Sequence, residues 1–322
     1  MTQAIMGIDL GGTAIKTALV STKKEIIAQE SRPTEAEKGL SVVLDNMQGA
    51  FNALAQNDVE IVAAGIGAPG PLNYKTGVVF SPPNLPGWKN VPLADQMKKR
   101  LGIPCFIDND ANLATYGEFW MGAGQDTDTL CALTLGTGVG GGIIVNGKLH
   151  RGIDGTAGEI GHLKVTDDGR TCGCGAQGCL EAYASVTGMV ATAQEALESG
   201  KETTLRNAIQ GDTSKLNGKL IAELANQGDS LCNSILDDTA NWLGIGISSL
   251  INLFNPEKIV LCGGMIAAGE RLIAPIREKA FSQSFKVPAD RCEIVTAQLG
   301  NDAGVLGAAG AAWERYSDSA VQ

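Results

Sequence analysis

A histidine and three cysteines stand close together in one glycine-rich segment of the sequence. His162 is followed by Cys172, Cys174 and Cys179 within AGEIGHLKVTDDGRTCGCGAQGCLEAY, residues 157–183. Imidazole and thiolate are the ligands that Zn²⁺ prefers, four of them complete a tetrahedral structural site, and glycines let a short chain fold around one ion. Free thiols or a disulfide would leave the histidine unexplained. The spacing therefore predicts one structural zinc ion per chain, although Cys-x-Cys is tighter than the commonest zinc spacings.

Two glycine-rich turns each separate a pair of apolar, strand-like runs. They are DLGGTAIK, residues 9–16, and LGTGVGGG, residues 135–142. Backbone amides in such turns can approach phosphate oxygens closely because no side chain intervenes. An ordinary tight turn explains either one alone. Together with Asp9, which can orient Mg²⁺, and with the hydroxyl of Thr137, the two turns favour a nucleotide clamp.

Two other nucleotide-binding motifs match incompletely. GTGVGG, residues 136–141, satisfies G-x-G-x-x-G, but a strand-like run and an Asn-Gly turn follow it where a dinucleotide site needs a helix. Residues 142–149 nearly spell a Walker A loop, but Leu149 stands where serine or threonine is required. We therefore expect neither a Rossmann site nor a P-loop.

A polar cluster follows the apolar run at residues 105–108 and opens a helix. Open α/β sheets bind their ligands at the carboxyl ends of strands, which is where this cluster lies. Asp110 is the best candidate for a general base, since beside Asn109 it can hold a sugar hydroxyl and take its proton during phosphoryl transfer. The alternative role is that of a helix N-cap. Repulsion from Asp108, two residues earlier, is expected to raise the pKa of Asp110.

Length and charge restrict the class of protein. A chain of 322 residues predicts two domains, and a net charge of -10 disfavours nucleic acid and anionic membranes as partners. The sequence contains no run of 18 apolar residues and begins without a positively charged leader, so we predict a cytoplasmic protein. The remaining cysteines are isolated in apolar segments and are expected to be small core residues; they are Cys105, Cys131, Cys232, Cys262 and Cys292.

The hydrophobic pattern alternates between strand and helix periods. Residues 4–10, 14–20 and 25–30 are expected to form a meander, residues 40–54 a helix, and residues 61–66 a buried strand. Residues 81–90 contain three prolines and predict an irregular loop in which Asn84 and Trp88 are placed for contact. The strand, glycine turn, strand arrangement recurs at residues 130–145, which suggests two domains with a common plan.

Several motifs together resemble the ROK family (repressors, open reading frames and sugar kinases), and most closely its bacterial glucokinases. They are DLGGTAIK, PNLPGW, DNDAN, LGTGVGGG, AGEIGH, CGCGAQGCLE and NPEKIVLCGG, in the family's order and spacing. The resemblance implies an α/β chain with the actin-like ATPase (ribonuclease H-like) fold, in which two domains flank a cleft. We assign residues 1–112 plus 303–322 to a small N-terminal domain and residues 113–302 to a large domain that carries the zinc-binding loop.

The resemblance also implies roles for individual residues. Asp110 matches the base that deprotonates the 6-hydroxyl of glucose for attack on the γ-phosphate of MgATP, and His162 would serve zinc with one ring nitrogen and the sugar with the other. The sugar contacts would be Asn84, Asn109, Asp110, Glu159, His162 and Glu181. The nucleotide contacts would be Asp9, Gly11, Gly12, Thr13, Lys16, Gly136, Thr137 and Gly138, with Gly263 and Gly264 beside the adenosine.

Three other functions are alternatives to a glucokinase. A ROK repressor would need a DNA-binding extension before the first glycine turn, but only eight residues precede Asp9 and the chain is acidic. A sugar sensor without activity would be expected to have lost Asp110. A kinase for N-acetylmannosamine, N-acetylglucosamine, fructose or allose is the main rival. The family suggests a homodimer or a dimer of dimers, and polyphosphate or another nucleotide stays open as the donor.

Overall fold

The computed structural model describes residues 2–82 and 84–320, and the chain divides into two compact units. The first unit comprises Met1–Asp128, Gly142–Gly158 and Gln298–Gln322, and the second comprises Thr129–Gly141 and Glu159–Ala297. These compact units differ from the predicted domains 1–112 plus 303–322 and 113–302, because residues 113–128, 142–158 and 298–302 belong to the first unit. Among the described residues, no helix combines the length and the apolar character needed to span a bilayer.

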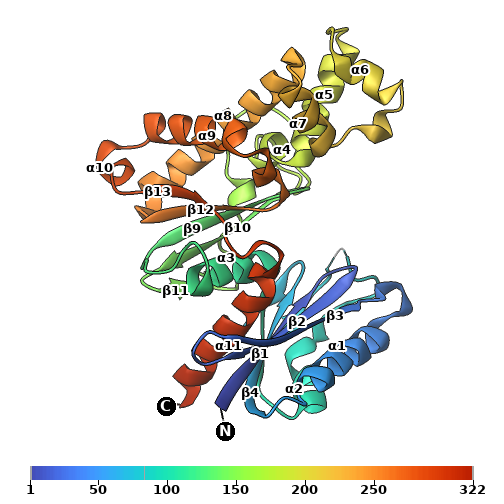
Figure 1. The fold of residues 1–322 in the computed structure, drawn as a ribbon, viewed down its shortest axis with the longest axis vertical. Coiled ribbons are helices and arrows are strands. Elements are labelled where there is room, and N and C mark those ends of the chain that lie inside the picture. The colour runs from blue at the N-terminus through green and yellow to red at the C-terminus, as the bar shows by residue number, and fades with distance from the viewer. Residues whose placement is uncertain (1, 83, 321–322) are drawn as a thin grey trace. The chain divides into compact units, whose positions relative to one another are not determined.

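A five-stranded sheet forms the centre of the first unit, in the order β3-β2-β1-β4-β8 (Figure 1). Strands β1, β2 and β3 form the expected antiparallel meander, and β4 and β8 extend it in parallel to β1. Their bounds are β1 Thr2–Leu10, β2 Ala14–Ser21, β3 Ile26–Pro33, β4 Val59–Ala68 and β8 Cys105–Asn109. The first glycine turn, residues 11–13, is the β1–β2 connection, as the sequence predicts.

Helices cover both faces of this sheet. α1 (Leu40–Leu54) has the predicted bounds and packs its apolar side against Met6, Ile8 and their neighbours. The remaining helices of the unit are α2 (Leu93–Leu101), α3 (Asp110–Met121) and α11 (Ala303–Ala320). A small antiparallel sheet, β5 (Leu72–Asn73), β6 (Val78–Val79) and β7 (Val91–Pro92), brackets the proline-rich loop and was not expected from the sequence.

The C-terminal helix α11 returns to the first unit and lies against β1, β4 and α3 (Figure 1). Glycine is required at this contact, because a Cβ atom on Gly7 would lie 2.0 Å from the carbonyl oxygen of Val305, and one on Gly65 would lie 1.8 Å from that of Ala308. The alanine-rich sequence of α11 thus gives close backbone packing, and it holds the strand ends that carry the candidate site.

The second unit contains most of a second five-stranded sheet, in the order β11-β10-β9-β12-β13. The strands are β9 (Leu130–Leu135), β10 (Val139–Val145), β11 (Lys148–Leu149), β12 (Lys258–Cys262) and β13 (Glu293–Thr296). β10 follows the second glycine turn, residues 136–138, which confirms that no helix opens there. The helices are α4 (Glu181–Ala184), α5 (Val186–Glu198), α6 (Thr204–Ile209), α7 (Gly218–Asn226), α8 (Ser230–Phe254), α9 (Glu270–Gln283) and α10 (Lys286–Ala289).

Candidate active site

The carboxyl end of β8 and the first turn of α3 present Asn109 and Asp110 side by side. Asn109 is the N-cap of α3, and its Oδ1 accepts hydrogen bonds from the amides of Ala111 at 2.9 Å and Asn112 at 3.2 Å. The capping role that we considered for Asp110 therefore belongs to Asn109. Asp110 is the first helical residue, and its carboxylate stays exposed while accepting one hydrogen bond from the Ala111 amide at 2.9 Å.

Partial burial raises the pKa of Asp110. Protein atoms crowd around its exposed carboxylate and remove water, which disfavours the charged form, while hydrogen bonds from the Ala111 amide, its own amide and the Asn109 side chain lower the pKa. The structure thus gives a cause other than the expected repulsion from Asp108. A raised pKa makes Asp110 a stronger base than an ordinary aspartate, which is the property that proton abstraction requires.

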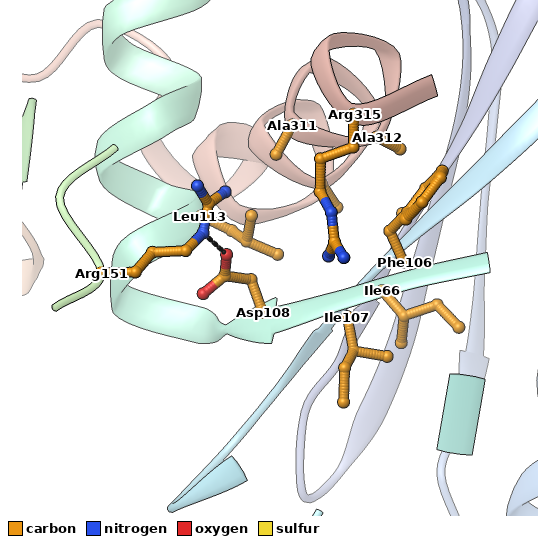
Figure 2. Close-up of a pocket in the computed structure, with 11 residues that line it drawn as sticks. Ile66, Phe106, Ile107, Asp108, Leu113, Arg151, Ala311, Ala312 and Arg315 are labelled. Atoms are coloured by element: carbon orange, nitrogen blue, oxygen red, sulfur yellow. Dashed lines mark hydrogen bonds and ion pairs between the residues drawn. The ribbon is translucent and has the colours of Figure 1, made fainter. Parts of the chain in front are cut away.

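The charge of Asp108 is neutralised by an arginine that the sequence did not single out. Asp108 is 3% exposed, and its Oδ2 accepts a hydrogen bond from Arg151 Nε at 2.5 Å. Figure 2 shows this pair beside the first turn of α3. The Oδ1 of Asp108 accepts from the Asn109 amide at 2.9 Å and from Asn112 Nδ2 at 3.3 Å. Asp108 is therefore a support for the strand end and not a second catalytic carboxylate.

Asp9, at the end of β1, lies close enough to Asp110 for their charges to interact. Burial, and then the charge of Asp110, raise the pKa of Asp9 to about 6, while Lys16 lowers it. The carboxylate packs against α11, because a Cβ on Gly304 would lie 2.9 Å from its Oδ2. Two carboxylates that repel each other at the end of a sheet are a suitable environment for a divalent cation, so the residues present fit the predicted Mg²⁺ that accompanies ATP.

Replacing Asp9 with asparagine should raise thermal stability and lower turnover in the same variant. The folded-state pKa of about 6 exceeds the reference value of 3.8, so ionisation of Asp9 costs stability as the pH rises through this interval, and the cost is complete above it. Asparagine removes that cost together with a carboxylate oxygen for Mg²⁺. We expect a higher Tm than wild type at pH 8, a difference that shrinks as the pH falls below about 6.

The control for this variant is Asp58→Asn, which changes an exposed carboxylate in the same unit. Its Tm should follow that of the wild type across the same pH range. A Tm for Asp9→Asn that equals the wild-type value at pH 8, or that differs by the same amount at every pH, would contradict the assignment of burial and repulsion to Asp9.

The first glycine turn lies against the loop that carries Asn84. A Cβ on Gly12 would lie 3.1 Å from the Cβ of Asn84, so the two predicted ligand-binding segments are adjacent in the first unit. Asn84 is exposed, whereas Trp88 is 3% exposed and belongs to the core, so Trp88 anchors the loop and is not a contact residue. The Nζ of Lys16 donates a hydrogen bond to the carbonyl oxygen of Asn301, in the turn that precedes α11, at 2.8 Å.

In the second unit, the second glycine turn is held by the start of α5 and by Glu181. The Val186 amide donates to the carbonyl oxygen of Gly136 at 2.9 Å, and Thr187 Oγ1 donates to that of Thr137 at 2.7 Å. Glu181 Oε2 accepts from the Val139 amide at 2.9 Å. The sequence suggested Glu181 only for the sugar, but the structure shows that its carboxylate also fixes the end of this turn.

Three more predicted glycines lie in or near the second glycine turn. A Cβ on Gly138 would lie 2.3 Å from Glu181 Oε2, so glycine is required where the carboxylate approaches. Gly263 has a φ of 92°, and a Cβ on this residue would lie 2.3 Å from the carbonyl oxygen of Leu135, at the end of β9. Gly263 and Gly264, at the start of the turn after β12, thus adjoin the strand that leads into the second glycine turn.

The four predicted zinc ligands converge. One ligand atom from each of His162, Cys172, Cys174 and Cys179 lies within 4.8 Å of the others, with Cys172 Sγ 3.6 Å from His162 Nδ1 and Cys174 Sγ 3.8 Å from Cys179 Sγ. A tetrahedral zinc ion with Zn–S of about 2.3 Å and Zn–N of about 2.0 Å would separate two sulfurs by about 3.8 Å and a sulfur from a nitrogen by about 3.5 Å. All four cysteine and histidine side chains therefore fit a zinc ion, and the cysteines are free thiols and not a disulfide.

Charged side chains next to this cluster interact with its ligands. Three thiolates and one neutral imidazole around Zn²⁺ leave one net negative charge, and Lys164 Nζ lies 3.7 Å from Cys179 Sγ, where it offsets that charge. Because Nδ1 of His162 faces Cys172, its Nε2 faces away from the cluster, 4.0 Å from Glu159 Oε2. The second unit thus places Glu159 beside His162, while the predicted role of these two residues toward a sugar stays a prediction.

Comparison with known proteins identifies the family. The model of the ROK family matches residues 5–315 of the chain. The chain belongs to the ROK family. It is similar to a glucokinase of Halalkalibacterium halodurans, with 39% identity over 94% of this chain and 92% of the relative. Among solved structures, a ROK family glucokinase from Streptomyces griseus in complex with glucose and AMPPNP has 36% identity and a TM-score of 0.77, covering 97% of this chain and 99% of that chain.

ROK membership confirms the predicted α/β, actin-like ATPase fold. It does not by itself determine the activity of the chain. The family also contains regulators: the chain is 32% identical to a xylose repressor of Caldicellulosiruptor bescii, covering 94% of this chain and 76% of the repressor. Family membership alone therefore does not separate a kinase from a sugar-responsive repressor. The separation draws on the similarity to glucokinases together with the chemistry of the site.

Proposed function

We propose that this ROK protein is a hexose kinase that transfers the γ-phosphoryl group of MgATP to the 6-hydroxyl of glucose. The observation that carries the proposal is the 39% identity to a glucokinase over nearly the whole of both chains. The reactive geometry agrees with it, because Asp9 and Asp110 interact electrostatically in the first unit, and Asp110 has a raised pKa beside the side chain of Asn109, which hydrogen-bonds to it. A repressor that only senses sugar has no need of such a base.

Asp110 removes the proton from the sugar 6-hydroxyl as that oxygen attacks the γ-phosphorus of ATP. The bond from the γ-phosphorus to the bridging oxygen breaks, ADP leaves, and the proton stays on the carboxyl group of Asp110 until it passes to solvent. Asn109 uses its Oδ1 for the helix cap, so its Nδ2 remains to donate to Asp110 or to a sugar oxygen. Positioning supplies most of the acceleration, since oriented reactants can gain roughly 7 to 11 kcal/mol.

The other predicted residues bind and orient the two substrates. The amides of residues 11–13 and 136–138 bind phosphate oxygens, with Lys16 adding positive charge and Asp9 holding Mg²⁺ when MgATP is bound. Asn84, Glu159, His162 and Glu181 pair with sugar hydroxyls, and unpaired carboxylates and amides are costly when the wrong epimer binds. Zinc supplies rigidity to the segment that carries these groups and takes no part in the chemistry.

A coupled assay across a panel of sugars with ATP tests the proposal. Glucose should give the highest kcat/KM, ahead of N-acetylmannosamine, N-acetylglucosamine, fructose and allose, by at least about tenfold, the selectivity that a few well-placed hydrogen bonds provide. A parallel series with polyphosphate in place of ATP decides the donor. Highest kcat/KM with an N-acetylhexosamine would replace glucose as the substrate, and no turnover with any sugar while sugar binding persists would favour the sensor. The cytoplasmic location and the dimeric state stay predictions.

A further inference from the structure

A small cavity lies in the first unit on the side of the sheet that α11 covers. Its lining is apolar apart from three charged side chains, Asp108, Arg151 and Arg315. Figure 2 shows Arg151 and Arg315 approaching it from the loop after β11 and from α11, with Asp108 between the strand end and α3. The volume open to a water-sized centre is about 10 Å³, so one water molecule or one ion of similar size would fill it.

The two arginines each leave one buried nitrogen without an acceptor. Arg151, 11% exposed, uses Nε for Asp108 and Nη1 for the carbonyl oxygen of Leu149 at 3.5 Å, but its Nη2 has no hydrogen-bond partner in the described part of the chain. Arg315 Nη1 is buried and likewise unpartnered among the described residues. Buried N–H groups of a guanidinium are costly to leave unsatisfied, so both need an acceptor that the protein does not supply.

The lining of this cavity carries more positive than negative charge. Two guanidinium groups and one carboxylate line the cavity, and Asp108 has already committed both oxygens to Arg151, Asn109 and Asn112. Glu314, outside the lining, also acts on both arginines through its charge. Aromatic rings compensate part of the charge, since Arg315 stacks 4.7 Å from the ring centroid of Phe106, but a ring face cannot accept the in-plane N–H groups. Burial, and then the charge of Arg151, lower the pKa of Arg315, while Asp108, Tyr74 and Glu314 raise it.

We propose that this cavity binds one small monovalent anion, chloride or its congener bromide, between the guanidinium groups of Arg151 and Arg315. A water molecule would satisfy the hydrogen bonds, whereas an anion would satisfy them and also be attracted by the two guanidinium charges that line the cavity. A compact halide matches the small volume better than a tetrahedral oxyanion such as phosphate or sulfate. Because Arg151 holds Asp108, two residues before Asp110, the anion would fix Arg151 beneath the strand end that carries the base. The site belongs to the first unit and does not depend on which sugar the protein phosphorylates.

Bromide provides the direct test, because it scatters anomalously and replaces chloride. Crystals of the full chain grown in sodium bromide should show one anomalous peak in the cavity, between Arg151 Nη2 and Arg315 Nη1. In solution, Tm should rise saturably as chloride replaces gluconate at constant ionic strength, because an ion that binds only the folded state stabilises it. A cavity that contains only water in bromide crystals, with equal Tm in chloride and gluconate, would overturn the proposal.

Two variants separate a specific site from a general salt effect. Arg315→Met should lose the chloride dependence of Tm, whereas Arg100→Met, which removes an arginine paired with Asp45 on the surface of the same unit, should keep it. If Arg315→Met does not fold, Arg315→Lys supplies the comparison, since a point charge cannot reproduce the guanidinium geometry and should weaken the chloride response at least severalfold. Equal chloride responses in wild type and both arginine variants would show that the ion binds elsewhere.

Discussion

Replacement of Asp110 by asparagine is expected to abolish phosphoryl transfer while sugar affinity stays within about tenfold of the wild-type value. Asparagine keeps the size of the side chain and its acceptor for the Ala111 amide, but it cannot take a proton. A positioned general base contributes typically 10²- to 10⁴-fold, so kcat should fall by about a thousandfold or more. Turnover by the coupled assay and glucose affinity by calorimetry measure the two effects separately.

The matched control is Asp95→Asn, because Asp95 is an exposed carboxylate in the first turn of α2, as Asp110 is in the first turn of α3. Both substitutions remove a negative charge that favours a helix N-terminus, so they should change helix stability alike. Only Asp110→Asn should lose activity. An Asp110→Asn enzyme that retains a tenth of wild-type kcat would mean that another group takes the proton, or that solvent does.

The pH profile follows from the same residue. The raised pKa of Asp110 means that its base form is lost on acidification at a pH above the ordinary range of aspartate, so the acid side of the kcat profile reports this group together with Asp9. Bound Mg²⁺ would lower both pKa values by attraction. The acid limit in the ternary complex should therefore lie below the pKa of about 6 that Asp9 has in the free protein.

Sequence patterns predicted the local elements well because they depend on neighbours along the chain. The apolar period of residues 40–54 gives α1 with the same bounds, and the glycine turns stand where β1–β2 and β9–β10 connect. The zinc cluster could be predicted for a similar reason, since its ligands lie within 18 residues of each other in a glycine-rich segment and need little of the rest of the fold.

Contacts between distant segments could not be predicted in the same way. Arg151 lies 43 residues from Asp108, in a loop without a motif, and only the packing of that loop in the first unit pairs the two. Glu181 fixes the turn at residues 136–138 only because α4 packs against that turn. Its hydrogen-bond partner, Val139, lies 42 residues away in the sequence. The N-cap role considered as an alternative for Asp110 lies one residue earlier, at Asn109, because Asp and Asn are both favoured N-caps and composition does not distinguish them.

The second large effect is expected for Cys174→Ser, which should lose zinc and most of the glucose affinity together. Cys174 is the exposed cysteine of the cluster, so serine in its place leaves the packing of the buried Cys172 and Cys179 undisturbed. Serine is a poor zinc ligand, and three remaining ligands hold the ion far less tightly than four. Elemental analysis should give about one zinc per wild-type chain and almost none in the variant.

Affinity should fall with the metal because the cluster orders the segment that carries the predicted sugar contacts. Zinc on His162 Nδ1 fixes the ring so that Nε2 is directed away from the cluster, and Cys172 Sγ lies 3.6 Å from Glu181 Oε1. Without the ion, three thiols and the imidazole lose their common partner, and binding must first order the glycine-rich chain around them. The Kd for glucose, measured by calorimetry, should rise at least about tenfold. The KM for ATP should change less.

Cys105→Ser is the control, since Cys105 is also incompletely buried but lies in β8, outside the cluster. It should keep both zinc and glucose affinity. A Cys174→Ser protein that folds, contains no zinc and binds glucose as wild type does would show that the glycine-rich segment orders itself, and the metal would then be dispensable for sugar binding. If zinc and affinity fall in proportion across Cys174→Ser and chelator-treated wild type, the metal acts by ordering Glu159, His162 and Glu181, and the catalytic proton transfer remains with Asp110 alone.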